Sequence, residues 1–177
     1  WADGDRMTVS DEMCPSVRFG GDGYSSEWHE LAVRERGLEN LRTSADALPV
    51  LQRPEIRELF ERTGVLSPVE LESRFEVYTE QYILAIEVEA KLAVRIARTQ
   101  LTPAVMAHLE RVVRCLRDQE SLGMPADRVG VTQLSALQQQ LTRLCDELDQ
   151  QIANPPHSHH DHLHHCAGRL LPLMGQI

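Results

Sequence analysis

A long run of helically spaced apolar residues constrains the fold of this chain more than any other feature. It starts at Ser67, Pro68 and Glu70, where serine can accept from free amides, proline needs no donor and glutamate can reach back. From there apolar and aromatic residues recur every three or four positions to about Gln100: Leu71, Phe75, Tyr78, Tyr82, Ala85, Val88, Leu92 and Ile96. The pattern predicts a capped helix about 50 Å long, since each residue adds about 1.5 Å.

Further helices are expected to follow with short connections. Thr102-Pro103 is expected to break or kink the long helix. A helix to about Leu122 then buries Val105, Met106, Leu109, Val112 and Leu116. After a loop over residues 123–130, Thr132 is expected to cap a helix with the apolar spacing of a coiled-coil seam: Leu134, Leu137, Leu141, Leu144, Leu148 and Ile152. Beyond Asn154-Pro155-Pro156, a last segment repeats this spacing at Leu163, Cys166, Leu170, Leu173 and Ile177.

The N-terminal third predicts shorter elements. Ser25 can cap a helix over residues 26–36 that stops at Gly37, and a second short helix should run over residues 54–62 before Gly64. Together the patterns predict an all-α fold, an antiparallel bundle of long helices with two short N-terminal helices. The expected organisation is an unassigned irregular lead-in over residues 1–20, two short helices and turns over residues 21–66, and one long-helix bundle over residues 67–177.

Charge and cysteine content narrow the possible partners. With 18 Lys and Arg against 27 Asp and Glu, the net charge of −9 argues against nucleic acid. No run of apolar residues is long enough to cross a bilayer, so we expect no membrane contact and a cytoplasmic location. The four cysteines, Cys14, Cys115, Cys145 and Cys166, show no paired spacing and are expected to be reduced. Because numbering begins at Trp1, we expect a fragment or processed product.

A histidine cluster is the most conspicuous candidate for chemistry. It comprises His157, His159, His160, His162, His164 and His165. On a helix, His160 and His164, or Asp161 and His165, share a face with metal-ligand spacing, and Cys166 adds a soft ligand. The favoured interpretation is nevertheless a solvated helix start that binds metal only adventitiously, because a functional site also needs fixed geometry.

Two further features receive structural interpretations. Glu89 lies on the largely apolar face of the long helix, where it is expected at a rim or paired with Arg95, Arg98 or Arg111, while Glu87 is expected to be solvated. The glycine-rich stretch over residues 20–24 is expected to form a tight turn before the first helix, with no phosphate-binding signature. No catalytic, cofactor or metal residue is therefore assigned.

Several short motifs, in order, resemble the C-terminal region of type III glutamine synthetases. They are Gly21-Asp22-Gly23-Tyr24-Ser25, Glu27-Trp28, Arg36-Gly37-Leu38, Asn40-Leu41, Ala47-Leu48-Pro49 and Gly64-Val65-Leu66-Ser67. The long helix continues the resemblance with Glu70-Leu71, Ser73-Arg74, Glu76, Tyr78, Glu80, Tyr82, Ile86 and Val88-Glu89-Ala90, followed by Pro103-Ala104-Val105. The likeness covers about residues 19–110.

The resemblance implies a parent enzyme, a ring-shaped homo-oligomer that joins ammonia to glutamate with ATP and Mg or Mn. In that family the ligands of nucleotide, metal and glutamate belong to the preceding catalytic domain, so none is carried onto this chain. The resemblance thus implies a non-catalytic structural and oligomerisation module, with its own catalytic domain and neighbouring subunits as partners. We also expect the excised piece to self-associate or expose apolar surface. The alternatives are a stand-alone His-rich metal-binding helical protein and a coiled-coil adaptor.

Overall fold

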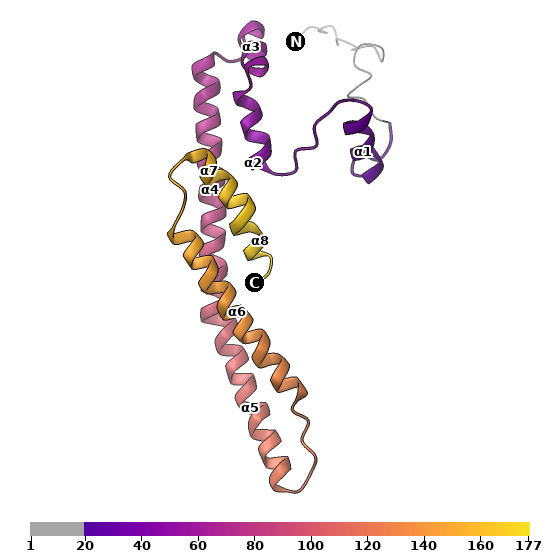
Figure 1. Ribbon diagram of the computed structural model, residues 1–177, viewed down its shortest axis with the longest axis vertical. Helices are drawn as coiled ribbons and strands as arrows, with labels where there is room; N and C mark the ends of the chain where they lie inside the picture. The colour runs from indigo at the N-terminus through magenta and orange to yellow at the C-terminus, as the bar shows by residue number, and fades with distance from the viewer. Residues whose placement is uncertain (1–19) are drawn as a thin grey trace, which may run out of the picture. The chain divides into compact units, whose positions relative to one another are not determined.

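The computed structural model describes residues 20–177, and the chain divides into two units, residues 1–46 and 47–177. Figure 1 shows the helices of the described part. The predicted lead-in lies almost wholly outside these residues. No strand occurs in residues 20–177, and every regular element there is helical, which confirms the prediction of an all-α fold.

The first unit contains helix α1, Ser26–Arg34, whose start follows from local hydrogen bonding. The Ser25 hydroxyl accepts from the Trp28 amide at 3.2 Å, as its sequence position predicts. Before it, the Asp22 side chain accepts from the Tyr24 amide at 3.0 Å, so the glycine-rich stretch forms the expected turn. Gly37 follows the helix with φ +65°, a left-handed conformation that glycine adopts at little cost. The short helix α2, Ser44–Ala47, lies at the unit boundary.

The second unit opens with a 3-10 turn, η1 (Leu48–Gln52), and helix α3 (Pro54–Thr63). The predicted start and stop of α3 are confirmed, since Pro54 is its first residue and Gly64 has φ +66°. Both α2 and η1 were absent from the sequence prediction because they are too short to show a period. Glu72 joins this part to the next helix by accepting from Arg57 and, at 3.2 Å, from Gln52.

Helix α4, Pro68–Ile96, has the predicted capping box: Ser67 accepts from the Glu70 amide, and the Glu70 carboxylate accepts from the Ser67 amide. It continues through a π turn, η2 (Ala97–Leu101), into α5 (Thr102–Ser121). The helix therefore does not break at Pro103, and the expected interruption takes the form of a π turn directly before the Thr102-Pro103 step. In the π turn the Thr102 amide bonds the Ala97 carbonyl, five residues back, so the helix widens just before the residue that lacks an amide proton.

Helix α6, Val129–Ala153, returns antiparallel to α4 and α5, as Figure 1 shows. It begins three residues before the predicted cap: Asp127 accepts from the Val129 amide, and Thr132 lies inside the helix with its hydroxyl bonded to the Arg128 carbonyl. After the predicted stop at Asn154, the chain forms α7 (His159–His165), a second π turn η3 (Cys166–Leu170) and α8 (Leu171–Met174). The first π turn directly precedes Thr102-Pro103, and this second one directly precedes Leu171-Pro172.

The core lies where α6 and the segment from α7 to α8 both pack on α4. It includes Leu148 of α6 and Leu163, Cys166, Leu170 and Leu173 of the last segment, and these predicted apolar positions are confirmed as buried. Toward the other end, α5 packs mainly on α6 and contains no buried residue. The unit thus has a three-layered end and a two-helix end.

On α4 the predicted buried stripe is largely wrong. Leu71 is buried, but Tyr78, Val88, Leu92 and Ile96 are exposed. The core instead uses Thr79, Ile83, Ile86, Ala90, Val94 and Ala97. Apolar residues occur on both sides of this helix, so the helical period alone does not say which side is covered. The packing of α6, α7 and α8 on α4 determines which side of the helix is covered.

Candidate functional site

The histidine cluster divides into an outer and an inner set on α7. His159, His160 and His164 are exposed, and His157 precedes the helix. The rings of His160 and His164 lie 4.6 Å apart between centroids, as their spacing predicts. His162 and His165 are partly buried, and His165 Nε2 lies 3.2 Å from the Gln151 carbonyl oxygen of α6. Consecutive histidines thus point to different surroundings.

The inner set brings α7 against a carboxylate of α4. His162 Nε2 lies 3.1 Å from Glu87 Oε1, and both side chains are less than a fifth exposed. The approach lacks the alignment of a hydrogen bond, and His162 Nε2 is buried without another protein partner. Lys91, one turn along α4, donates to the other Glu87 oxygen at 2.9 Å. Glu87, Lys91 and His162 therefore form a small polar cluster at the interface of α4 and α7.

The electrostatics of this group follow from its neighbours. The hydrogen bond from Lys91 lowers the pKa of Glu87, the Lys91 charge and His162 act in the same direction, and burial opposes them. Burial raises the pKa of the nearby Cys166 thiol to about 11, and the negative charge of Glu87 adds to this effect. Cys166 is consequently a protonated thiol at neutral pH and a poor nucleophile.

The expectations for the two α4 carboxylates are only partly met. Glu89 is exposed, and among residues 20–177 it forms no ion pair with Arg95, Arg98 or Arg111. Arg98 instead donates to Asp149 and, at 2.7 Å, to Asp146, both of α6. Glu87, predicted to be solvated, is the carboxylate that faces the interior. In the sequence, only the apolar neighbours Ile83, Ile86 and Ala90 indicate that Glu87 faces the interior.

No group of three His, Cys, Asp or Glu side chains in the described part of the chain is placed to hold a metal ion. His160 and His164 offer two imidazoles at an exposed position, and a fixed site requires more ligands and a supporting shell. The residues present therefore do not fit a Mg, Mn or Zn centre. We assign no chemical step to them.

Exposed apolar residues form the more extensive candidate surface. Along α4, Val77, Leu84, Val88 and Leu92 lie opposite the buried side and are about half exposed, from 45% for Val77 to 63% for Leu84. We call these four residues the α4 ridge. The sequence predicts exposed apolar surface, but Val88 and Leu92 of this row belong to the run that was expected to face the core. Scattered single exposed side chains need no explanation, whereas a row on one helix side marks a contact surface.

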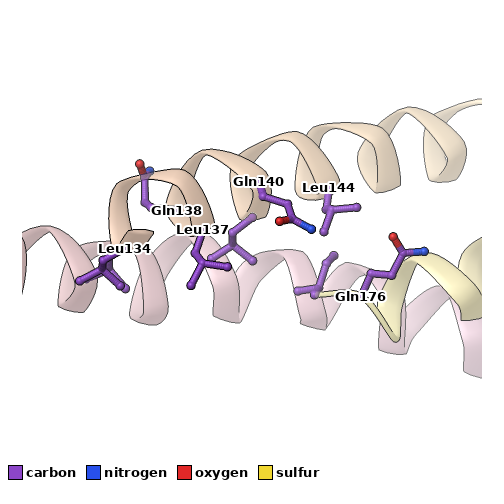
Figure 2. Close-up of a pocket in the computed structure, with 9 residues that line it drawn as sticks. Leu134, Leu137, Gln138, Gln140, Leu144 and Gln176 are labelled. Carbon is purple, nitrogen blue, oxygen red and sulfur yellow. The ribbon is translucent and has the colours of Figure 1, made fainter. Parts of the chain in front are cut away.

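A second apolar feature lies where the C-terminus meets α5 and α6. Figure 2 shows Leu134, Leu137 and Leu144 of α6 at this pocket, together with Gln176 from the end of the chain. Val105 and Ile177 complete its apolar lining, and its volume is about 230 Å³. None of the side chains that line it is charged. The pocket thus suits apolar side chains better than a charged small molecule.

The fold and these surfaces define a class: an all-helical chain whose long central helix carries apolar residues on two opposite sides. No helix in residues 20–177 could span a bilayer. A family model described as glutamine synthetase C-terminal domain matches residues 8–120, more than half of the chain. The chain belongs to this family, as the sequence motifs predicted. All of α6, α7 and α8, with the histidine cluster, follow the matched range.

Three curated relatives agree with this assignment. A type-3 glutamine synthetase of Dictyostelium discoideum is 36% identical over 126 residues, which cover 66% of this chain and 17% of the relative. A glutamine synthetase of Butyrivibrio fibrisolvens is 33% identical over 106 residues, or 60% and 15%. One of Bacteroides fragilis is 29% identical over 119 residues, or 63% and 16%. The chain thus spans about a sixth of these relatives' length. No solved structure matches it.

Proposed function

We propose that the chain is a structural and oligomerisation module of a glutamine synthetase, and that it is not catalytic alone. The parent enzyme would join ammonia to glutamate in the cytoplasm at the expense of ATP, with Mg or Mn held by a separate catalytic domain. The observation that carries this proposal is the α4 ridge, together with the family membership. The second apolar side of α4 needs a partner that the described residues do not supply.

The ridge favours the catalytic body of the same enzyme as that partner. Arg74 and Arg95 lie exposed at its two ends and on the same side of α4, at helical spacing from Val77 and Leu92. If a second α4 packed on the ridge in parallel register, each of these two arginines would lie near the same arginine of the other copy. In antiparallel register, Arg74 of one copy would lie near Arg95 of the other, which is again a contact between like charges. A different surface, apolar at its centre and acidic at its rim, is the better complement.

Glutamine formation tests the catalytic part of the proposal. This chain is compared with a protein extended upstream through the reading frame, each supplied with glutamate, ammonia, ATP and magnesium. We expect activity in the extended protein alone, because none of the described residues forms a metal-holding group. Activity of the 177-residue chain by itself, or inactivity of a folded extended protein, would contradict it.

A ridge variant tests the structural part. In the extended protein, Leu84→Glu should lower both activity and assembled mass, because it puts a charge into the proposed contact. Leu84→Met keeps the surface apolar and serves as the matched control. Leu84 is 63% exposed here, so neither change should unfold the helix itself. Equal activity and mass for both variants would rule out the ridge as the contact.

A further inference from the structure

The two-helix end of the second unit has an open apolar seam. We define the arm as α5, Thr102–Ser121, together with residues 129–144 of α6. None of these residues is buried, although both helices carry leucine and valine at seam positions. Leu137 is 61% exposed and Val113 48% exposed. The seam of these two helices is accessible except at the Figure 2 pocket, where Gln176 and Ile177 from the end of the chain also line it, so the arm is a candidate for packing with other helices.

One side of the arm gathers the accessible grooves. Cys115 follows the seam residue Val112 by three positions, and Leu137 follows the seam residue Leu134 by three. Equal steps turn two antiparallel helices toward the same side, so Cys115 and Leu137 share one side of the arm. The Figure 2 pocket contains Leu134 and Leu137, and a neighbouring groove contains Val112 and Cys115. We call this the groove side.

The groove side is poor in charge. From Val129 to Leu144 of α6, the sequence has a single charged residue, Arg143, and α5 contributes Arg111 and the imidazole of His108 to the groove. The other polar groups there include the amides of Gln119 and Gln140, which both donate and accept hydrogen bonds. The opposite side is different, since its groove contains the Arg128–Glu120 ion pair. Depletion of charge is typical of the centre of a protein interface.

We propose that the groove side packs against the groove side of a second copy of this chain, so that two arms form an antiparallel four-helix bundle. Each of the two surfaces carries few charged groups, Arg111 near the middle of α5 and Arg143 near the end of the arm. Amides that both donate and accept complement an identical surface. Helices about 30 Å and about 24 Å long and about 10 Å wide together offer roughly 540 Å² per copy. That gives roughly 1,100 Å² in total, just above the roughly 1,000 Å² expected of a biological interface.

This inference names the partner for the assembly role proposed above and rests on that role. The two proposals assign different partners to two different surfaces. The α4 ridge contacts the catalytic body, and the groove side of the arm contacts the arm of a second copy. Each surface contains an exposed leucine in mid-helix, Leu84 at 63% and Leu137 at 61% exposed. The two leucines therefore provide a matched pair of variants that should fold equally well.

The test is sedimentation of the full 177-residue chain over a range of concentrations. We expect the mass to rise from that of one chain toward that of two. Leu137→Glu should raise the dissociation constant at least about tenfold, because a charge then lies at the interface centre. Leu84→Glu should leave it within about twofold. A monomer at all concentrations, an unaffected Leu137→Glu, or a loss of association in Leu84→Glu alone would overturn the inference.

Alkylation of Cys115 gives a second readout at the same surface. Cys115 is exposed, whereas burial raises the pKa of the Cys145 and Cys166 thiols, so Cys115 should react first in a chain carrying Cys14→Ser. Its protection should grow with concentration in the otherwise unchanged chain and in Leu84→Glu, but not in Leu137→Glu. Protection independent of concentration would contradict an arm contact between copies.

The two proposals can fail separately. If Leu137→Glu prevents association while the extended protein makes no glutamine, the arm contact stands and the ligase assignment fails. If the extended protein is active and the chain never associates, the ligase assignment stands and the arm contact fails.

Discussion

Glu87 and Glu89 lie two residues apart on α4, yet their side chains have different surroundings. Glu87 lies between Lys91 of its own helix and His162 of α7, whereas Glu89 is exposed. Two residues on a helix turn the side chain through about 200°, which moves it from the covered side to the solvent. The position of a charged residue within an apolar run therefore indicates burial only when the covered side is known.

The contact of Glu87 predicts a pH dependence. Its pKa is lower in the folded chain than in the unfolded one, so the stabilisation it gives is present above the unfolded value and lost as pH falls through the folded value. Melting from pH 7 to pH 3 should show a smaller acid-induced loss for Glu87→Gln than for the unchanged chain. After allowance for solvent screening, the difference should be below about 1 kcal/mol.

Glu89→Gln is the control, because this carboxylate is exposed and makes no described ion pair. Its melting profile should follow that of the unchanged chain across the whole range. If Glu89→Gln flattens the acid branch and Glu87→Gln does not, the assignment of the interior carboxylate is wrong.

Helix ends show what the sequence predicts well at the scale of single elements. The capping serines Ser25 and Ser67, the left-handed Gly64 and the stop at Asn154 all occur where their chemistry placed them. Each depends on a few neighbouring residues, so one sequence suffices. Helix α6 starts four positions earlier than a cap at Thr132 predicts, because Asp127, outside the helix, accepts from the Val129 amide.

The capping box gives an element-scale prediction. Ser67→Ala removes the hydroxyl that accepts from the Glu70 amide, and it should lower the free energy of unfolding by about 1 kcal/mol. Ser73→Ala, an exposed position inside the same helix, should be neutral or slightly stabilising because alanine favours helix. Urea denaturation followed by circular dichroism measures both. Equal effects of the two substitutions would show that the cap does not stabilise the chain.

At the scale of the whole second unit, helical content was predictable and the choice of buried sides was not. Periodicity and caps give helices, and antiparallel packing follows from short connections, as between α5 and α6. On α4, however, Ile86 and Val88 are equally apolar, and only contact with α6 to α8 distinguishes them. The polar contact of Glu87 with His162 depends on the same packing across 75 positions of sequence, beyond the reach of a local pattern.

The uneven core predicts uneven stability. Residues 79–97 and 163–173 contain most of the buried side chains, while the arm contains none. Hydrogen exchange measured in dilute solution should therefore label amides of residues 105–121 and 129–140 well before those of residues 83–94. The measurement is exchange mass spectrometry on peptides from each range. Uniform protection along the unit would contradict a two-part distribution of stability.

The two π turns set how the sequence can change without loss of the fold. Each lies just before a proline, at residues 97–101 and 166–170, and accommodates one residue more than a regular turn. One residue corresponds to about 100° of rotation around a helix axis. Loss of a single codon within residues 97–101 would convert the π turn to a regular α turn, without the rotation that a deletion inside a regular helix imposes on everything after it. The relative orientation of the groove side of α5 and the α4 ridge is therefore buffered against a one-residue deletion at this turn.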